Sequence, residues 1–404
     1  MNTVLTSARV PLPRATGAWQ EGDPPGRRQW YAHEAPLELE AGGELAGVRL
    51  AFETWGRLAP DASNAVLVLH ALTGDSHVAG PSAPGHPTPG WWDGLVGPGR
   101  ALDTDHWFVV APNVLGGCQG STGPASLAPG GRRWGGAFPF LTQRDQVAAE
   151  AHLADALGID RWALVAGGSM GGMRALEWAV SRPERTGALL LLATTAAASA
   201  EQIAWATVQL HAIRSDPYWQ DGHYHGTGRG PATGLAQARR LAHVTYRSEQ
   251  ELHTRFGRLP QEAEDPWDGG RYRVESYLDH HAAKLVRRFD AGSYVVLSEA
   301  MNSHDIGRGR GGVRGALRRV TAPTLVAAVG SDRLYPPSQQ RELAAGIPTA
   351  DAVRVIDSPY GHDGFLIEDE QVAGLVDALL SHPEDRRRPR PGDVSGASPG
   401  PAEG

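Results

Sequence analysis

The sequence predicts an α/β fold, in which a mostly parallel β-sheet is covered by helices on both faces. Short apolar runs alternate with stretches of helical periodicity over most of the chain. These runs are continuously apolar, as expected for parallel strands that are buried on both faces. One long stretch, 195–312, breaks this alternation with a polar and aromatic helical pattern, which predicts a helical insertion.

The elements follow one another in a regular order. A strand at 48–54 comes first, and the run at 64–70 ends at a glycine-containing loop. A helix at 145–157 is expected to end at Gly158, because glycine commonly caps a helix C-terminus. The remaining strands are expected at 107–111, 161–166, 188–193, 324–329 and 353–356, and the remaining helices at 170–181 and around 370–380.

Length and composition suggest one large domain with an insertion. The chain has 404 residues, of which 41% are hydrophobic, enough for a sizeable core. Residues 1–35 and 383–404 are rich in proline, glycine and charge and are expected to form a loose arm and a disordered tail. We therefore expect a core from 36–194 and 313–382, with 195–312 inserted as a helical cap.

Charge and cysteine content narrow the function classes. A net charge of −7 with 21% charged residues gives no indication of nucleic acid or membrane as a partner. The N-terminus lacks the pattern of a secretory signal, no apolar run reaches the length of a membrane span, and the single cysteine excludes an intrachain disulfide. We expect a cytoplasmic protein.

The strongest motif is Gly-Gly-Ser-Met-Gly at 167–171. It lies between a predicted strand and a predicted helix, the context in which a serine on a sharp turn acts as a nucleophile. The flanking glycines allow close chain packing, and the helix N-terminus favours developing negative charge. The motif predicts an α/β-hydrolase fold with Ser169 as the nucleophile. The alternative is a glycine-rich turn that carries an incidental serine.

A serine nucleophile needs a base and an acid that orients the base, in this fold in the order serine, acid, histidine. Asp332 follows the strand at 324–329, and His362 follows the last strand in a glycine-flanked loop. Several other histidines lie in the cap or before Asp332, so His362 is the expected base. Asp332 could instead serve only as a turn residue before Pro336.

The oxyanion of an acyl intermediate requires two backbone donors. One is expected from Met170, directly after the nucleophile, and the other from Leu72 in the loop after the strand at 64–70. No metal-binding spacing, P-loop or dinucleotide fingerprint is present, so we expect no metal and no permanently bound cofactor. Cys118 lies in a glycine-rich loop and is expected to be structural.

Several long motifs resemble one known family. The segments are 64–78 (NAVLVLHALTGDSHV), 113–124 (NVLGGCQGSTGP), 138–147 (FPFLTQRDQV), 167–178 (GGSMGGMRALEW) and, in the cap, 234–248 (GLAQARRLAHVTYRS) and 277–312. In this order they are similar to the homoserine O-acetyltransferases, acyltransferases of methionine biosynthesis with an α/β-hydrolase fold. The resemblance covers about 37–380 and implies Ser169, Asp332 and His362 as the triad.

The resemblance also implies the substrates and their contacts. Acetyl-CoA would acetylate Ser169, and L-homoserine would then take the acetyl group in a ping-pong reaction. Arg239 matches the family arginine that holds the homoserine carboxylate, Asp363 matches the residue that takes the ammonium, and Tyr246 is a weaker candidate for the pocket wall. Solvated faces are expected for Arg240, Arg247 and Arg310, with contacts to CoA phosphates as the alternative.

The choice of acyl group depends on Leu334, two residues after the predicted triad aspartate. Family members that transfer succinyl tend to carry an arginine there, so leucine favours acetyl, and the neighbouring Arg333 is expected to point elsewhere. Succinyl transfer, a serine acceptor, an esterase or thioesterase activity and a catalytically inactive binding protein remain alternatives. The resemblance further implies a homodimer in which the caps meet.

Overall fold

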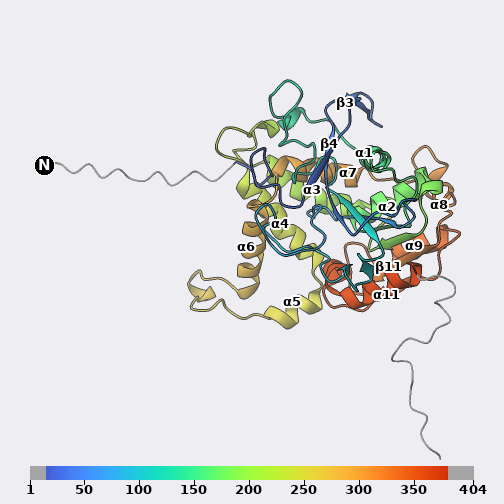
Figure 1. The fold of residues 1–404 in the computed structure, drawn as a ribbon. Helices are drawn as coiled ribbons and strands as arrows, with labels where there is room; N and C mark the ends of the chain where they lie inside the picture. Colours follow the sequence, from blue (N-terminus) through green and yellow to red (C-terminus); the bar gives the residue numbers. More distant parts are fainter. Residues whose placement is uncertain (1–14, 381–404) are drawn as a thin grey trace, which may run out of the picture.

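An eight-stranded sheet forms the centre of the computed structural model, which describes residues 15–380 (Figure 1). The strand order is β1–β4–β8–β5–β9–β10–β11–β12; β4 is antiparallel to β1 and β8, and the other pairs are parallel. The strands are β1 (Gln29–Ala32), β4 (Arg49–Trp55), β5 (Ala65–Leu69), β8 (Phe108–Pro112), β9 (Leu164–Gly168), β10 (Leu189–Leu192), β11 (Thr324–Val329) and β12 (Arg354–Ile356). The mostly parallel sheet of the α/β-hydrolase fold is confirmed.

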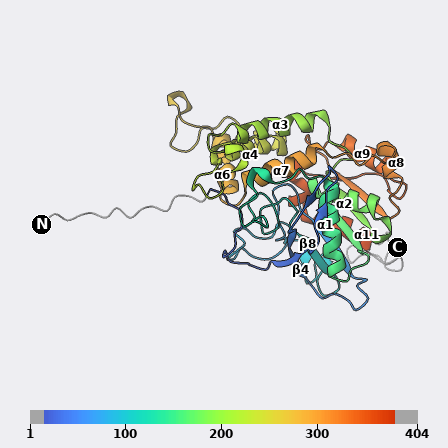
Figure 2. The ribbon, with the colours of Figure 1, turned by 90° about the horizontal axis from the view of Figure 1, so that it is seen from above.

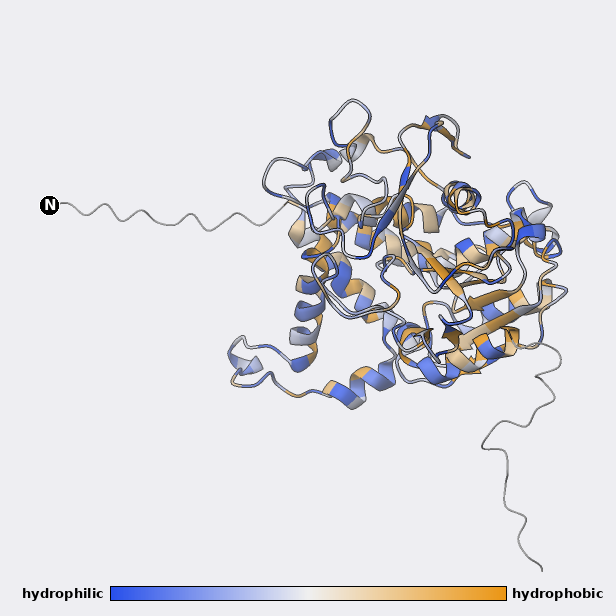
Figure 3. Cartoon of the chain, in the orientation of Figure 1, coloured by the Kyte–Doolittle hydropathy of each residue, from blue (hydrophilic) through white to orange (hydrophobic). Residues whose placement is uncertain are grey.

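Helices cover both faces of this sheet because alternate residues of each central strand point to opposite sides. Leu67 and Leu69 of β5 pack with residues of α1 (Gln143–Ala156), α2 (Met170–Ser181), α8 (Gly312–Leu317) and α9 (Pro337–Gly346). Val66 and Val68 face the other way, toward α11 (Asp369–Leu380) and the short helix α10 (Gly364–Ile367). Figure 3 colours the central strands as hydrophobic, in agreement with burial on both sides.

Five longer helices lie between β10 and β11. They are α3 (Ala200–Arg214), α4 (Ala232–Tyr246), α5 (Glu249–Phe256), α6 (Arg273–Val286) and α7 (Ala291–Asn302). Figure 2 shows α3, α4, α6 and α7 gathered on one side of the molecule. A hydrophobic cluster there joins Leu210, Leu235 and Leu285 of these helices to Leu72 and Met170, so the predicted cap, 195–312, packs against the loops that surround the predicted nucleophile.

One part of the cap extends away from the body. The connection from α5 to α6 projects into solvent in Figure 1, and Trp267 within it is 98% exposed. Two small sheets complete the fold, β2 (Leu37–Glu38) with β3 (Glu44–Leu45) and β6 (Val96–Gly97) with β7 (Leu102–Asp103). No helix in residues 15–380 combines the length and the apolar character needed to cross a bilayer.

Part of the N-terminal segment is ordered, which corrects the expectation of a loose arm over the whole of 1–35. β1 pairs with β4, Ala18 is buried, and the hydroxyl of Thr16 donates to the buried Asp290. The four-residue β1 is half-exposed and lies at the sheet edge, so its apolar signal is too short to stand out among prolines and glycines. The expected disorder of 383–404, like residues 1–14, lies outside the described residues.

Candidate active site

Ser169 occupies the turn between β9 and α2 in a strained backbone conformation. Its φ of 56° and ψ of −126° are unusual for a residue other than glycine. The turn is possible because its glycines leave room: a Cβ on Gly171 would come within 2.0 Å of the Leu69 carbonyl oxygen, and one on Gly167 within 2.3 Å of the Gly171 carbonyl. The close approach of β5, β9 and α2 thus places Ser169 at the N-terminus of α2.

Ser169, His362 and Asp332 form a continuous hydrogen-bonded chain. His362 Nε2 lies 2.8 Å from Ser169 Oγ, and His362 Nδ1 lies 2.7 Å from Asp332 Oδ2. All three side chains are buried. The structure therefore brings together the three residues that the sequence predicted as a triad, from loops 30 and 193 positions apart in the chain.

The orientation of Asp332 is set by its own loop after β11. Its Oδ1 accepts hydrogen bonds from the backbone N–H groups of Leu334 (2.8 Å) and Tyr335 (2.9 Å), which leaves Oδ2 for His362. The ring of Tyr335 stacks on the His362 imidazole with centroids 4.8 Å apart. Asp332 is therefore a turn residue, which was the alternative expected from the sequence, and it is also the hydrogen-bond partner of His362.

Leu72 lines the same cavity as Ser169, and Met170 follows Ser169 directly as the first residue of α2. Among residues 15–380, neither backbone N–H donates to a protein acceptor, so both are available to a ligand. Two arginines of the cap bind Thr73, the residue after Leu72. Arg288 donates to the Thr73 carbonyl (2.7 Å), and Arg239 donates to the Thr73 hydroxyl (3.3 Å). The cap therefore helps to position the predicted oxyanion loop.

His70, at the start of the same loop, has a structural role. Its Nε2 accepts a hydrogen bond from the Val114 N–H (3.0 Å), and its carbonyl accepts one from Arg174 (2.7 Å). Burial, reinforced by the charge of Arg174, lowers the pKa of His70 to about 3, so the ring stays neutral. Arg174 in turn pairs with the buried Glu150, which connects α1, α2 and this loop.

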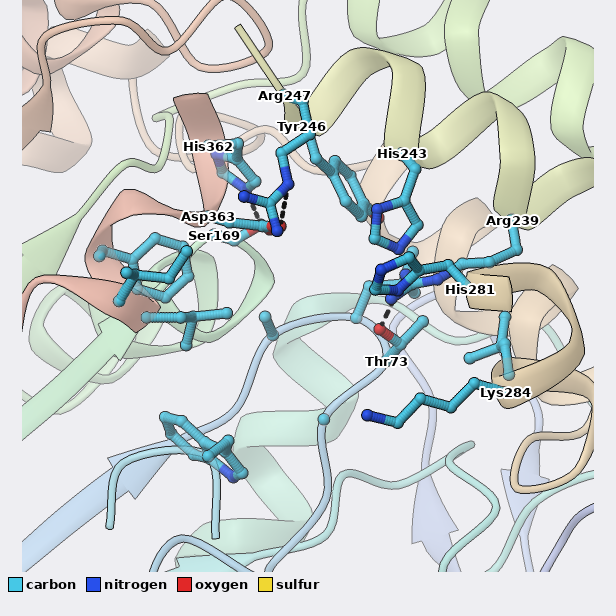
Figure 4. Close-up of a pocket in the computed structure, with 18 of the residues that line it drawn as sticks. Thr73, Ser169, Arg239, His243, Tyr246, Arg247, His281, Lys284, His362 and Asp363 are labelled. Atoms are coloured by element: carbon cyan, nitrogen blue, oxygen red, sulfur yellow. Dashed lines mark hydrogen bonds and ion pairs between the residues drawn. The ribbon is translucent and has the colours of Figure 1, made fainter. Parts of the chain in front are cut away.

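A cavity of about 280 Å³ opens beside Ser169 and His362 (Figure 4). Its floor comes from the loop at 71–74 and its roof from cap helices α4 and α6. Besides Asp363, these walls add four cationic side chains and two imidazoles: Arg239, Arg247, Arg288, Lys284, His243 and His281. Burial lowers the pKa of these two histidines and keeps them neutral, so the charge of the walls comes from the four cations against one carboxylate. In a chain with a net charge of −7, this local excess indicates a site for an anionic ligand.

Arg239 and Tyr246, both predicted from the cap motif, lie in this cavity. The guanidinium of Arg239 stands over the Tyr246 ring at 5.6 Å, and its buried Nε has no hydrogen-bond partner among residues 15–380. Tyr246 also lies beside His362, with ring centroids 5.8 Å apart. Tyr246 therefore forms the wall between the predicted carboxylate site and the predicted nucleophile.

Asp363 lines the cavity too, but it is not alone. Arg247 Nε lies 3.3 Å from Asp363 Oδ2, and both side chains are largely buried (Figure 4). The expectation of a solvated Arg247 is thus wrong, because the end of α4 turns this side chain inward onto the loop of His362. Arg310 is also not solvated, since it forms two hydrogen bonds to the buried Glu177. Arg240 pairs with the partly exposed Asp279.

Leu334 lies behind the predicted oxyanion loop rather than in the main cavity. It lines a smaller cavity of about 50 Å³ together with Leu72, Tyr246 and Tyr335. Arg333 points away from this space and donates to the carbonyl of Val244 on α4. No cation therefore reaches the smaller cavity from position 333 or 334.

Several residues of the site were not predicted from the sequence. His243, His281, Lys284 and Arg288 line the cavity, and Tyr335 packs on His362. Position 243 could have been found, since it lies four residues after Arg239 and therefore on the same face of a helix. The side chains of α6 and the stacking of Tyr335 depend on the packing of the cap onto the core, which periodicity does not reveal.

One buried group outside this cavity resembles a metal site in composition. Within residues 15–380, ligand atoms of Glu53, His77 and His86 lie within 4.8 Å of one another. The two imidazoles, however, stack face to face at 3.8 Å with 9° between their planes. Because each ring directs its lone pair within its own plane, two stacked rings cannot both point at one ion. Glu53 and His77 form a structural ion pair, and together with His86 they do not fit a metal.

Comparison with known proteins agrees with this geometry. The model of a family described as alpha/beta hydrolase fold matches residues 64–369. The chain is 68% identical to the homoserine O-acetyltransferase of Thermobifida fusca over 372 residues, which cover 92% of this chain and 98% of that protein.

Solved structures extend the comparison. The structure of homoserine O-acetyltransferase from Bacillus anthracis matches with a TM-score of 0.80 and 27% identity, over 88% of this chain and 97% of that one. An acetylester hydrolase from Corynebacterium glutamicum matches with a TM-score of 0.75 and 25% identity, over 88% and 96%. The chain belongs to the homoserine O-acetyltransferase family of α/β-hydrolase-fold acyltransferases.

Proposed function

We propose that this protein transfers the acetyl group of acetyl-CoA to the hydroxyl of L-homoserine. The observation that carries the proposal is the placement of one cavity between a hydrogen-bonded Ser169–His362–Asp332 chain and a buried arginine with free donor capacity, Arg239. A nucleophile and a carboxylate site in one cavity suit an acceptor that carries both a hydroxyl and a carboxylate.

In the first half-reaction, His362 takes the proton of Ser169 while Oγ attacks the thioester carbonyl of acetyl-CoA. The carbonyl oxygen becomes an oxyanion, and the N–H groups of Leu72 and Met170 stabilise it. The carbon–sulfur bond then breaks, His362 returns the proton to the leaving thiolate of CoA, and acetyl-Ser169 remains. Asp332 keeps His362 in the tautomer that accepts this proton and stabilises the imidazolium.

In the second half-reaction, L-homoserine enters the emptied cavity. Arg239 binds its carboxylate, and Asp363, whose other neighbour is Arg247, takes its ammonium. The homoserine hydroxyl gives its proton to His362 and attacks the acetyl carbon, and Ser169 leaves as the restored hydroxyl. The cap above the cavity limits access of water and so favours transfer over hydrolysis.

Acetyl rather than succinyl is the proposed acyl group. A succinyl carboxylate would need a cation or several donors in the space behind Leu72. Leu334 is apolar and Arg333 is directed to the Val244 carbonyl, so neither supplies one. The cavity of about 50 Å³ at Leu334 also leaves little room for a longer acyl chain.

The test is a CoA-release assay with acetyl-CoA or succinyl-CoA against L-homoserine, L-serine or no acceptor. We expect rapid release only with acetyl-CoA and homoserine, together with an acetyl adduct on Ser169 detected by mass spectrometry when the acceptor is omitted. Release that is equally fast without an acceptor would contradict a transferase. The absence of any adduct and any release would indicate a binding protein.

Acetyl ester hydrolysis is the second candidate, since an acetylester hydrolase is among the structural neighbours. The same Ser169 chemistry would serve both, with water replacing homoserine in the second step. Hydrolysis of a simple acetyl ester, measured beside homoserine acetylation, separates the two. A higher kcat/KM for the ester than for acetyl-CoA with homoserine would favour the esterase.

We further propose a homodimer in which the caps meet. The cap carries several large hydrophobic side chains on its outer surface, among them Ile203 and Val208 of α3, Leu259 and Trp267. Light scattering after size-exclusion chromatography tests this, and Val208→Glu is expected to shift the mass toward the monomer. A monomer at all concentrations would exclude the dimer. Both proposed substrates and the single, buried Cys118 suit a cytoplasmic enzyme.

A further inference from the structure

His243 lies in the wall of the cavity and carries a buried ring nitrogen that no group of residues 15–380 satisfies. It lies on α4 one turn after Arg239, and its side chain is buried in the cavity wall (Figure 4). Its Nδ1 is 3.2 Å from the Tyr277 hydroxyl, whereas Nε2 has no hydrogen-bond partner among residues 15–380. A buried polar atom without a partner carries a desolvation cost that a bound ligand can relieve.

The surroundings decide which nitrogen of His243 carries the proton. Burial, followed by the charges of Arg239 and His281, lowers the pKa of His243 far below its ordinary value, so the ring is neutral. The Tyr277 hydroxyl needs an acceptor, and its neighbour Arg247 can only donate. Nδ1 of His243 is therefore the acceptor for Tyr277, and the ring proton lies on Nε2.

Two unused donors thus lie one helical turn apart. Arg239 Nε and His243 Nε2 are both buried, both belong to residues that line the cavity, and neither has a protein acceptor within the described chain. Side chains four residues apart on a helix lie on one face, so both donors belong to the same wall of the cavity, as the two oxygens of a single carboxylate would require.

We propose that His243 is a second binding residue for the carboxylate of the acceptor, through an Nε2–H that Tyr277 holds in place. This inference rests on the proposed function and adds the group that distinguishes an amino-acid acceptor from a simple alcohol. Arg239 supplies the charge, and His243 supplies a directed donor that fixes how the carboxylate lies. The hydroxyl of the acceptor is then directed past Tyr246 toward His362.

The test compares His243→Leu, His243→Gln and Tyr277→Phe with the unaltered enzyme. For His243→Leu we expect kcat/KM for L-homoserine to fall about 10- to 100-fold, the effect of a lost hydrogen bond to a charged group. The loss should appear mainly in KM, while the rate of acetyl-Ser169 formation in a single turnover stays unchanged. His243→Gln keeps an N–H donor and should recover most of the loss, and Tyr277→Phe should lose several-fold because the tautomer is no longer held.

A second acceptor, 3-aminopropan-1-ol, provides the control because it is homoserine without the carboxylate. With this acceptor, kcat/KM of the unaltered enzyme and kcat/KM of His243→Leu should be nearly equal. Equal loss with both acceptors, or slower acylation of Ser169, would overturn the proposal and assign His243 a structural role. Unchanged homoserine kcat/KM in His243→Leu would also overturn it. If the unaltered enzyme fails to acetylate homoserine, the proposed function itself fails, before any variant is compared.

Discussion

Individual side chains in this site serve two purposes at once. The carboxylate of Asp332 accepts hydrogen bonds from two backbone N–H groups with one oxygen and from His362 with the other, so it shapes its loop and orients His362, the predicted base. Arg239 bonds the Thr73 hydroxyl while keeping Nε free for a ligand. Substitutions at these positions therefore separate structural from chemical effects only when both are measured.

Asp332→Asn is expected to lower kcat by about 10⁴-fold with little change in thermal stability. The amide oxygen of asparagine can still accept the Leu334 and Tyr335 N–H groups, but its NH₂ group would face His362 Nδ1 and favour the wrong tautomer. Steady-state kinetics with a thermal melt checks this. A large fall in melting temperature would show that the loss arises from unfolding of the loop.

Arg239→Ala is expected to raise the KM for L-homoserine by about 10- to 100-fold, the effect of losing a charge-assisted hydrogen bond. Acylation of Ser169 by acetyl-CoA should stay nearly intact, because this step does not use the homoserine carboxylate. Burst kinetics of CoA release measures the acylation step directly. Equal loss in both half-reactions would instead assign Arg239 mainly to holding Thr73 and the oxyanion loop.

At the scale of elements, the site depends on how closely β5, β9 and α2 approach one another. Gly171 is packed so tightly against β5 that a methyl group would meet the Leu69 carbonyl oxygen. This contact joins the nucleophile turn to the strand that leads into the predicted oxyanion loop. The two loops therefore keep a constant separation only while position 171 carries no side chain.

Gly171→Ala is expected to lower the free energy of unfolding by about 1–3 kcal/mol and to reduce kcat as well. A matched control is Gly374→Ala in α11, where a Cβ meets nothing within 4 Å. There the lower backbone entropy of alanine should stabilise the protein by about 0.5–1 kcal/mol. Urea denaturation measures both variants. Equal effects at the two positions would contradict the steric argument.

The whole molecule is joined by buried polar contacts between distant parts of the chain. The cap-side Arg310 pairs with Glu177 of α2, and Asp290 before α7 accepts hydrogen bonds from Thr16 and Tyr224. Shortly after the predicted oxyanion loop at 71–74, His77 pairs with the buried Glu53 of β4. Such pairs make stability depend on the protonation of groups far from the active site.

The pH dependence of stability should reveal the His77–Glu53 pair. Burial alone would lower the pKa of His77, but the hydrogen bond and charge of Glu53 outweigh it, and the net shift is upward. A raised folded-state pKa means that the stabilisation is complete below the unfolded value of 6.5 and is lost as pH rises through the folded value.

His77→Gln should therefore destabilise the protein more at about pH 6 than at about pH 9. Denaturant unfolding of both proteins across this range measures the difference. His106→Gln is a suitable control, since this exposed histidine forms a surface ion pair with Asp103. A destabilisation by His77→Gln that grows with pH would contradict the assigned charge state.

Much of the fold follows from local chemistry. Continuous apolar runs such as β11 and the glycine-rich turn before α2 predict a parallel sheet with Ser169 at a strand-to-helix turn, because each depends on neighbours in the chain. The order of the segment at residues 15–35 could not be predicted from local chemistry, since β1 is short and is stabilised by pairing with β4. The inward direction of the Arg247 side chain could not be predicted either, because it depends on where α4 ends relative to the loop of Asp363.

The sequence by itself determined the chemistry at Ser169: motif order and the strand–turn–helix context predicted the serine, the aspartate and the histidine. Only the tertiary structure decided what surrounds them. The cationic cavity, the inward Arg247 and the buried Nε2 of His243 arise where α4 and α6 pack over the loop at 71–74. The physical reason is that a nucleophile turn is built from residues adjacent in sequence, whereas a substrate pocket is built from side chains that only long-range packing brings together.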